Sequence, residues 1–219
     1  MKKLLLLMLM LCVLLTGCGK EADPADANSD TVVDTNAVGT TINPLTDTTM
    51  DNLSDAIIHV SLEEGDAYVD DTGVMQMDVT VYSYDKYDMV DISMLKEGDI
   101  LVTNGGEVRV ESLERTDSAI LINGGLSAGG FDLVTDESGI FFECGYNDAM
   151  NWYAVGEATI RVSVDFVYYD NADLDQGEVV YYPGSFLIGE VTDYHFTPHN
   201  TTIRVENGQI VEMNRRYVP

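Results

Sequence analysis

The stretch Met75-Gln76-Met77-Asp78-Val79-Thr80-Val81 decides the fold class of this chain. Its apolar and polar side chains alternate with a period of two, which is typical of a β-strand with one buried and one exposed face. Turn-forming Asn-Gly pairs and glycine clusters separate further runs of this kind, and Asn207-Gly208 predicts a two-residue hairpin turn with positive φ. The other strand-like runs are residues 57–62, 99–103, 107–110, 119–122, 131–134, 140–143, 159–169, 179–182, 185–191 and 201–206.

Helical patterns are sparse in this sequence. Residues 87–95 and 147–153 could each hold one or two helical turns, and no long 3.6-residue period is present. We therefore expect an all-β fold, namely an antiparallel sandwich or barrel of many short strands with one or two short helical turns.

One short motif suggests a subdivision of the fold. Leu95-Lys96-Glu97-Gly98-Asp99 resembles the start of a strand in many small β-barrel modules. By this resemblance, Gly98 forms the turn before the strand and the Asp99 side chain caps that turn. The resemblance implies a compact barrel-like unit at about residues 90–135.

The first eighteen residues predict export from the cell. Met1-Lys2-Lys3 is basic, residues 4–15 are an apolar run, and Leu15-Thr16-Gly17-Cys18 follows directly. This order is typical of a secretory signal peptide, and the run is too short to span a bilayer. A chance cysteine after an ordinary signal peptide, or an uncleaved anchor, is the alternative interpretation.

The Leu15-Thr16-Gly17-Cys18 motif resembles the lipobox of bacterial lipoproteins. Membership of that family implies that residues 1–17 are removed and that Cys18 carries fatty-acyl chains such as palmitate. Acyl chains hold a protein at the bilayer surface without a spanning helix. We therefore expect a protein anchored in the cell membrane through Cys18, with its folded part on the extracytoplasmic face.

The composition changes between this anchor and the strand-rich region. Residues 18–50 consist largely of small and polar residues without aromatic side chains, and such a segment cannot bury enough apolar surface to fold. We expect it to be a disordered acidic tether, averaging roughly 30 Å from end to end. Residues 51–219 then form an all-β extracytoplasmic domain, in which Cys144 is the single cysteine and no disulfide can form.

The domain is strongly acidic. From Asp51 onward it contains 32 Asp and Glu against 8 Lys and Arg, a net charge of −24 with histidine neutral. Such a surface repels nucleic acid, so nucleic-acid binding is excluded as a function. The charge indicates either an acidic surface that keeps the protein soluble or carboxylates that gather Ca²⁺, a cation that takes six to eight oxygen ligands.

The acidic loop at 170–178 is the candidate Ca²⁺ site. It joins two aromatic runs but does not have EF-hand spacing, so an ordinary solvated turn is the alternative. No other cofactor is indicated. The candidate metal ligands are Asp170, Asp173, Asp175 and Glu178.

Catalytic signatures are weak throughout the chain. His195 and His199 have the spacing of a helical metal pair, but Pro198 and the surrounding strand pattern predict two surface loop histidines instead. Cys144 is a candidate nucleophile, and a core side chain is the alternative. Glu143 and Asp148 are a candidate carboxylate pair for glycoside hydrolysis.

Aromatic residues give the candidate binding surface. Tyrosines often stand in doublets, and in a strand each doublet places one ring in the core and one outward. We expect a binding or interaction module of the cell envelope for a glycan, a peptide or an envelope protein, with an envelope hydrolase or a structural component as alternatives. The candidate ligand-contacting residues are Trp152, Tyr153, Tyr168, Tyr169, Tyr181 and Tyr182.

Overall fold

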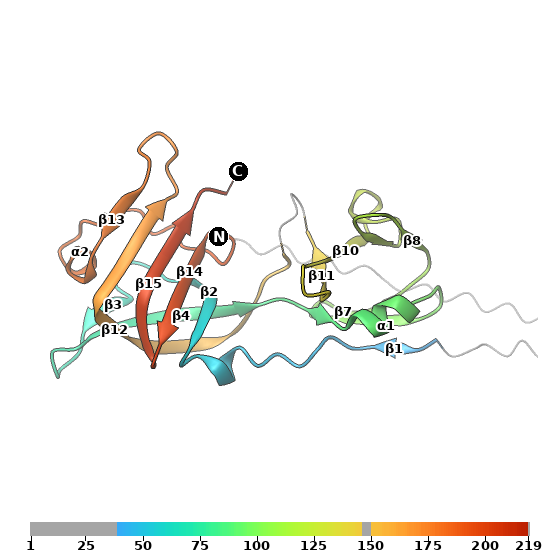
Figure 1. Ribbon diagram of the computed structural model, residues 1–219, viewed down its shortest axis with the longest axis horizontal. Helices are drawn as coiled ribbons and strands as arrows, with labels where there is room; N and C mark the ends of the chain where they lie inside the picture. The colour runs from blue at the N-terminus through green and yellow to red at the C-terminus, as the bar shows by residue number, and fades with distance from the viewer. Residues whose placement is uncertain (1–38, 146–149, 219) are drawn as a thin grey trace, which may run out of the picture. The chain divides into compact units, whose positions relative to one another are not determined.

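The computed structural model describes residues 39–145 and 150–218 of the chain (Figure 1). This part is all-β, with strands in a barrel-like or sandwich arrangement and two short α-helices, so the predicted fold class is confirmed. No helix among these residues is long and apolar enough to cross a membrane. The predicted signal peptide, Cys18 and most of the predicted tether lie outside the described residues.

Five strands hydrogen-bond to one another in a closed ring. Neighbours are antiparallel except for β12 and β15, which run parallel. Because β14 returns to lie beside β2, the ring is a Greek-key barrel, and OB-folds are five-stranded barrels of this architecture. Such a fold by itself does not assign a function. In order around the ring the strands are β2 (Ala56–Ser61), β4 (Met75–Ser83), β12 (Tyr153–Asn171), β15 (Gln209–Arg216) and β14 (Thr201–Glu206).

Two short strands extend the ring at its edges. β3 (Ala67–Val69) pairs with β4, and β13 (Val179–Tyr181) pairs with β12. The helix α2 (Pro183–Leu187) follows β13 and places Phe186 against two core rings, 6.2 Å from Phe166 and 5.7 Å from Tyr168 between ring centroids. The helix therefore contributes an aromatic side chain to the barrel core.

The barrel core is made by the inward-facing residues of all five strands. The alternation along β4 buries Met77, Val79 and Val81, and β2 contributes Ile58 and Val60. The period of two in these strands thus places one apolar face inside the ring, as the sequence predicts. The core also contains Leu62, Ile160, Val162, Phe166, Tyr168, Phe186, Val191, Phe196, Ile203, Val205, Ile210 and Met213.

A second group of strands has its own hydrophobic cluster; most of these strands lie in the connection between β4 and β12, and one precedes the barrel strands. β1 (Thr41–Ile42), β6 (Ile100–Thr103) and β7 (Gly106–Arg109) form a three-stranded sheet. A five-stranded sheet has the order β5 (Lys86–Tyr87), β11 (Phe141–Cys144), β10 (Phe131–Thr135), β9 (Ile120–Ile122) and β8 (Leu113–Arg115). The helix α1 (Met89–Met94) adds Ile92 to this cluster, which extends beyond residues 90–135 because Ile42 and Tyr87 also belong to it.

The Leu95-Lys96-Glu97-Gly98-Asp99 motif has the predicted local geometry. Gly98 has a φ of 91°, and the buried Asp99 carboxylate accepts the amide of Lys96 at 3.0 Å and that of Thr40 at 2.8 Å. The cap therefore also holds β1 against β6, with which it pairs in parallel. Because Ile42 is 6% exposed, the ordered chain begins before residue 51, and the predicted tether does not extend to residue 50.

Two other local predictions differ from the structure. Residues 185–191, expected to be a strand, begin inside α2, because Pro183 at the first helical position favours a helix and Ser185 Oγ accepts the Tyr182 amide at 3.3 Å. The helical turn expected at residues 147–153 is absent from its described part, because Met150 forms an isolated β-bridge with Cys144 and Tyr153 already begins β12. The short strands β3 and β8 were not predicted. The 3₁₀ turns η1 (Met50–Asn52) and η2 (Leu126–Ala128) complete the described elements.

Candidate ligand pocket around Arg215

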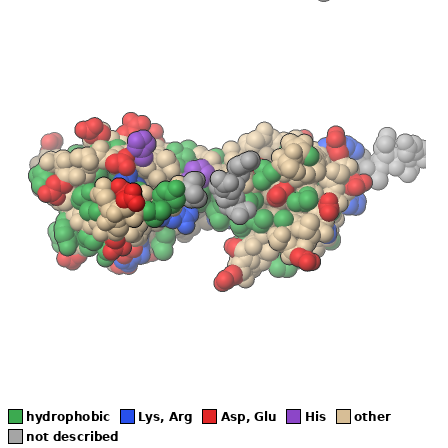
Figure 2. Space-filling model, turned by 90° about the horizontal axis from the view of Figure 1, so that it is seen from above, with side chains coloured by type: hydrophobic (Ala, Val, Ile, Leu, Met, Phe, Trp, Pro, Cys, Tyr) green, Lys and Arg blue, Asp and Glu red, His purple; other side chains and the backbone are tan. Residues whose placement is uncertain are grey.

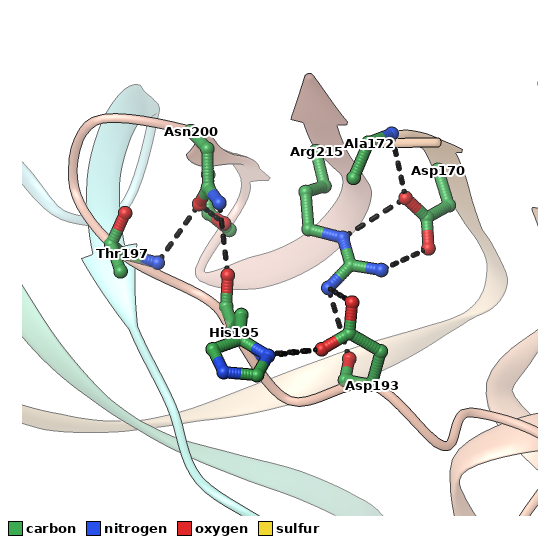
Figure 3. A network of polar contacts seen from close by, with 8 residues as sticks. Asp170, Ala172, Asp193, His195, Thr197, Asn200 and Arg215 are labelled. Carbon is green, nitrogen blue, oxygen red and sulfur yellow. Dashed lines mark hydrogen bonds and ion pairs between the residues drawn. The ribbon is translucent and has the colours of Figure 1, made fainter. Parts of the chain in front are cut away.

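A buried arginine lies at the end of the barrel strand β15. Parallel pairing of β12 with β15 sets Arg215 directly beside Asp170, and the Arg215 side chain is 4% exposed. Its Nε donates to Asp170 Oδ1 at 2.9 Å and its Nη2 donates to Asp170 Oδ2 at 2.5 Å (Figure 3). The guanidinium thus makes a bidentate ion pair with a carboxylate that is 12% exposed.

A second carboxylate contacts the same guanidinium. Nη1 of Arg215 lies 3.1 Å from Asp193 Oδ2 and donates to the Asp193 carbonyl oxygen at 3.0 Å. The exposed His195 ring lies 2.5 Å from the other Asp193 oxygen (Figure 3). The guanidinium carbon also lies 4.9 Å from the ring centroid of Phe196. Arg215 is therefore fixed by three side chains from two segments, namely Asp170 of β12 and Asp193 and Phe196 of the connection between α2 and β14.

The ion pairs shift the pKa of both carboxylic acids. Burial acts to raise the pKa of Asp170, but the hydrogen bonds from Arg215 and the Ala172 amide lower it below its ordinary value. Burial also acts to raise the pKa of Asp193, and the hydrogen bonds from His195 together with the Arg215 charge lower it. Both groups are ionised at neutral pH.

These residues line a pocket with a volume of about 590 Å³, here called the Arg215 pocket. It lies between the β12–β13 loop, the segment around Asp193 and the end of β15. Its carboxylates exceed its cations, and its apolar surface comes from aliphatic and tyrosine side chains. The lining consists of Asp170, Ala172, Asp173, Leu174, Asp175, Gln176, Gly177, Val179, Tyr181, Val191, Thr192, Asp193, Arg215 and Tyr217.

Three of the four candidate Ca²⁺ ligands line this pocket. Asp170 is held by Arg215, and Asp173 accepts the Asp175 and Gln176 amides at 2.9 and 3.3 Å. Glu178 accepts a hydrogen bond from Asn171 at 3.2 Å and is not part of the lining. Within the described ranges no group of three or more His, Cys, Asp or Glu side chains is arranged to hold a metal ion. Ca²⁺ binding by this loop stays a prediction.

The structure corrects the assignment of Tyr168 to a ligand-contacting surface. Tyr168 is 0% exposed and belongs to the barrel core, where it stacks on Tyr181 with ring centroids 5.3 Å apart. Its doublet partner Tyr169 is half-buried, so the strand rule for doublets holds here. The sequence could not show which ring of the doublet faces inward.

The remaining aromatic candidates fall in different places. Tyr181 lines the Arg215 pocket, whereas Tyr182 is 60% exposed at the start of α2. Trp152 is half-buried and stacks on His59 with centroids 4.1 Å apart, while Tyr84 meets its edge at 5.0 Å. This cluster joins β2 to the segments that leave β4 and enter β12, so its rings have a structural role.

Tyr153 starts β12, directly opposite the end of β4. It pairs with Ser83, and burial together with the charge of Asp85 raises the pKa of its hydroxyl to about 12. Tyr153 is half-buried, and its hydroxyl is therefore protonated at neutral pH.

The candidate catalytic groups do not form a recognisable site. Cys144 is 3% exposed in β11, with its thiol 3.6 Å from the Gly145 carbonyl oxygen, as in a core side chain. Burial raises the pKa of Glu143, whereas its predicted partner Asp148 lies outside the described residues. His195 and His199 are exposed in a non-helical loop, as expected.

Neither Arg215 nor Asp193 was predicted from the sequence. A signal for Arg215 was present, because Arg215 shares a strand face with the buried Met213 two residues earlier, and an inward-facing charge requires a partner. That partner is 45 residues away on β12, which no local pattern reveals.

Comparison with known proteins adds no relative: no family model, no curated protein and no solved structure matches this chain.

Proposed function

We propose that this protein is a lipid-anchored binding protein of the cell envelope whose β-barrel takes a positively charged ligand in the Arg215 pocket. The observation that carries the proposal is the charge of the lining. Four aspartates and one arginine line the pocket, which leaves a net charge of −3. Arg215 is already neutralised by Asp170 and shared with Asp193, so the excess negative charge is available to a ligand.

The apolar part of the lining indicates an amine with an alkyl chain. Leu174 and Val179 can contact methylene groups, and the tyrosine rings of Tyr181 and Tyr217 can contact an ammonium through their faces. Carboxylates accept hydrogen bonds from all three protons of a primary ammonium. A lysine side chain or an alkyl diamine has both properties, whereas an anionic ligand would be repelled.

The predicted location of the protein at the cell membrane supports a binding role over a catalytic one. The lipobox-like motif ending at Cys18 predicts an anchor at the outer face of the cell membrane. Asp and Glu side chains are spread over the face seen in Figure 2, as expected for a solvated domain in an exposed setting. Cys144, the candidate nucleophile, is buried rather than placed in the pocket.

Calorimetric titration of the full chain, purified in mild detergent, with 1,5-diaminopentane tests the pocket. The diamine should bind, and Asp175→Asn should weaken binding by about 0.5–1.5 kcal/mol, the range for a single polar contact. Asp71→Asn is the matched control, because Asp71 is an exposed aspartate that does not line the pocket. Equal affinity of Asp175→Asn and wild type for the diamine, or no binding at all, would refute the proposal.

The anchor is tested separately in cells. A fatty-acid analogue should label the wild-type chain and leave Cys18→Ser unlabelled. Equal incorporation into both would show that Cys18 is not acylated.

A further inference from the structure

β13 is an open edge of the barrel sheet next to the Arg215 pocket. Its only strand neighbour in the described part of the chain is β12, with Val180 opposite Tyr169. An edge strand presents alternate backbone N–H and C=O groups that can pair with another extended chain. The edge carries no lysine or proline within Val179–Tyr181 that would block such pairing.

Exposed apolar side chains surround this edge. Val180 is 40% exposed, Leu174 is 71% exposed and Tyr182 is 60% exposed. Apolar side chains gathered around an open strand edge are typical of a surface that another polypeptide covers.

The alternation along β13 couples the edge to the pocket. Val179 and Tyr181 line the Arg215 pocket, whereas Val180 is not part of the lining. A strand added to β13 has the same period of two, so every second side chain would lie on the pocket side of the sheet. The pocket's net charge of −3 selects lysine or arginine at those positions.

A buried tyrosine joins the pocket lining to the barrel core. The ring of Tyr168, which is 0% exposed, stacks on Tyr181, and its hydroxyl lies beside the Asp170 carboxylate. Both of these neighbours line the pocket, so this part of the lining packs directly on the core.

We propose that the edge of β13 binds an extended basic segment of a partner protein, which adds as a strand and places every second side chain over the Arg215 pocket. The inference rests on the proposed function, since it names the class of cationic ligand. A second copy of this chain is a poor occupant, because the domain from Asp51 onward carries a net charge of −24.

The test uses a synthetic peptide of about eight residues in which lysine and valine alternate, a length matched to a typical strand. The full chain in mild detergent should bind this peptide about tenfold more tightly than 1,5-diaminopentane. A version methylated at alternate backbone nitrogens keeps the charge but cannot form the ladder, and should bind about as weakly as the diamine. Hydrogen exchange of the Val179–Tyr182 amides should slow when the unmethylated peptide binds.

One variant separates the edge from the pocket. Val180→Lys places a positive charge on the edge and should weaken peptide binding at least about fivefold at physiological salt, where exposed charges are screened beyond about 8 Å. It should leave diamine affinity within about threefold, because Val180 is not part of the pocket lining. Val164→Lys, which introduces the same charge at an 88% exposed valine of β12, should leave peptide binding unchanged.

The outcomes distinguish this inference from the proposed function. Diamine binding without tighter peptide binding, equal binding of the methylated peptide, or unchanged exchange at β13 would overturn strand addition alone. Absence of both diamine and peptide binding would overturn the proposed function as well. Self-association of the full chain that protects β13 amides would replace the basic partner with a second copy and refute the inference.

Discussion

Replacing Arg215 by methionine should destabilise the barrel strongly. Methionine keeps most of the length and apolar bulk of the side chain but removes the guanidinium that contacts Asp170 and Asp193. The Asp170 carboxylate, 12% exposed, would then be left buried without its bidentate partner. Breaking a buried ion pair by removing one partner costs about 3–5 kcal/mol, because an uncompensated charge remains in the interior.

This cost converts to a large change in melting temperature. For a chain of this size, 1 kcal/mol corresponds to roughly 2–4 °C, so Arg215→Met should unfold roughly 6–20 °C below wild type. The double variant Arg215→Met with Asp170→Asn should recover a substantial part of the loss, because it removes the stranded charge. The ionised Asp170 carboxylate should therefore stabilise the fold when Arg215 is present and destabilise it when Arg215 is absent.

The pH dependence should change sign in the variant. In the wild type burial acts to raise the pKa of Asp170, but the hydrogen bonds from Arg215, the Ala172 amide and Tyr168, together with the Arg215 charge, outweigh it and lower the pKa. The pair therefore contributes stability above the unfolded-state pKa of about 3.9, and this contribution is lost as the pH falls through the lower folded-state value. Without Arg215, burial raises the Asp170 pKa, so the variant should gain stability relative to wild type as the pH falls from 7 toward 5.

Thermal unfolding followed by circular dichroism at a series of pH values measures both effects. Arg161→Met is the matched control, because Arg161 is an exposed arginine of β12, and its loss should shift the melting temperature by less than about 2 °C. A melting temperature of Arg215→Met within that same margin, or a pH dependence parallel to the wild type, would refute the reasoning.

Three further predictions concern other parts of the chain. Millimolar Ca²⁺ should raise the melting temperature, and replacing Asp173 and Asp175 together by Asn should abolish the rise, because a ligand of the folded state stabilises it. Burial lowers the pKa of His59, so its contribution to stability is present above about pH 6.5 and lost as the pH falls through the folded value. Trp152 fluorescence should be quenched in that acid window, because the two rings stack 4.1 Å apart. Gly130→Ala should destabilise the protein by about 1–3 kcal/mol, because its Cβ would lie 1.9 Å from a backbone oxygen of β9.

Each of these predictions has a control within the chain. Asp71→Asn should not alter any response to Ca²⁺, and a thermal scan unchanged by the ion would leave the loop as a solvated turn. His59→Gln should remove the acid quenching, and quenching that persists in this variant would assign it to another group. Gly105→Ala should cost little, because the nearest atom to its Cβ would be a threonine oxygen 3.4 Å away.

The parts of the fold that depend on neighbouring residues could be predicted from the sequence. Asn207 and Gly208 have φ values of 51° and 72°, as the predicted hairpin turn requires, because positive φ is a property of the turn itself. The Asp99 cap was predictable for the same reason. Ring closure was not, since the parallel pairing of β12 with β15 joins segments whose contact leaves no local pattern.

The candidate pocket could be predicted only in pieces. The acidic loop and Tyr181 were identified from composition and alternation, and the structure places both in one lining. Arg215, the buried cation that binds Asp170 and Asp193, was not identified, because its strand was interpreted only as the second half of a hairpin. Alternation assigns a side chain to one of two faces, but only the assembled barrel shows which face is inside, which is why Tyr168 was misplaced.

The position of the second group of strands has a consequence for the order of folding. The chain leaves the barrel at Ser83 and returns at Tyr153, and these two residues pair directly. An unfolded connection of roughly 70 residues would make this closure entropically costly, whereas a connection that has already folded with adjacent ends removes most of that cost. The strands of the connection can thus fold before the barrel closes and hold its two ends close together. Formation of their own hydrophobic cluster brings β4 and β12 together and so prepares the last seam of the ring to close.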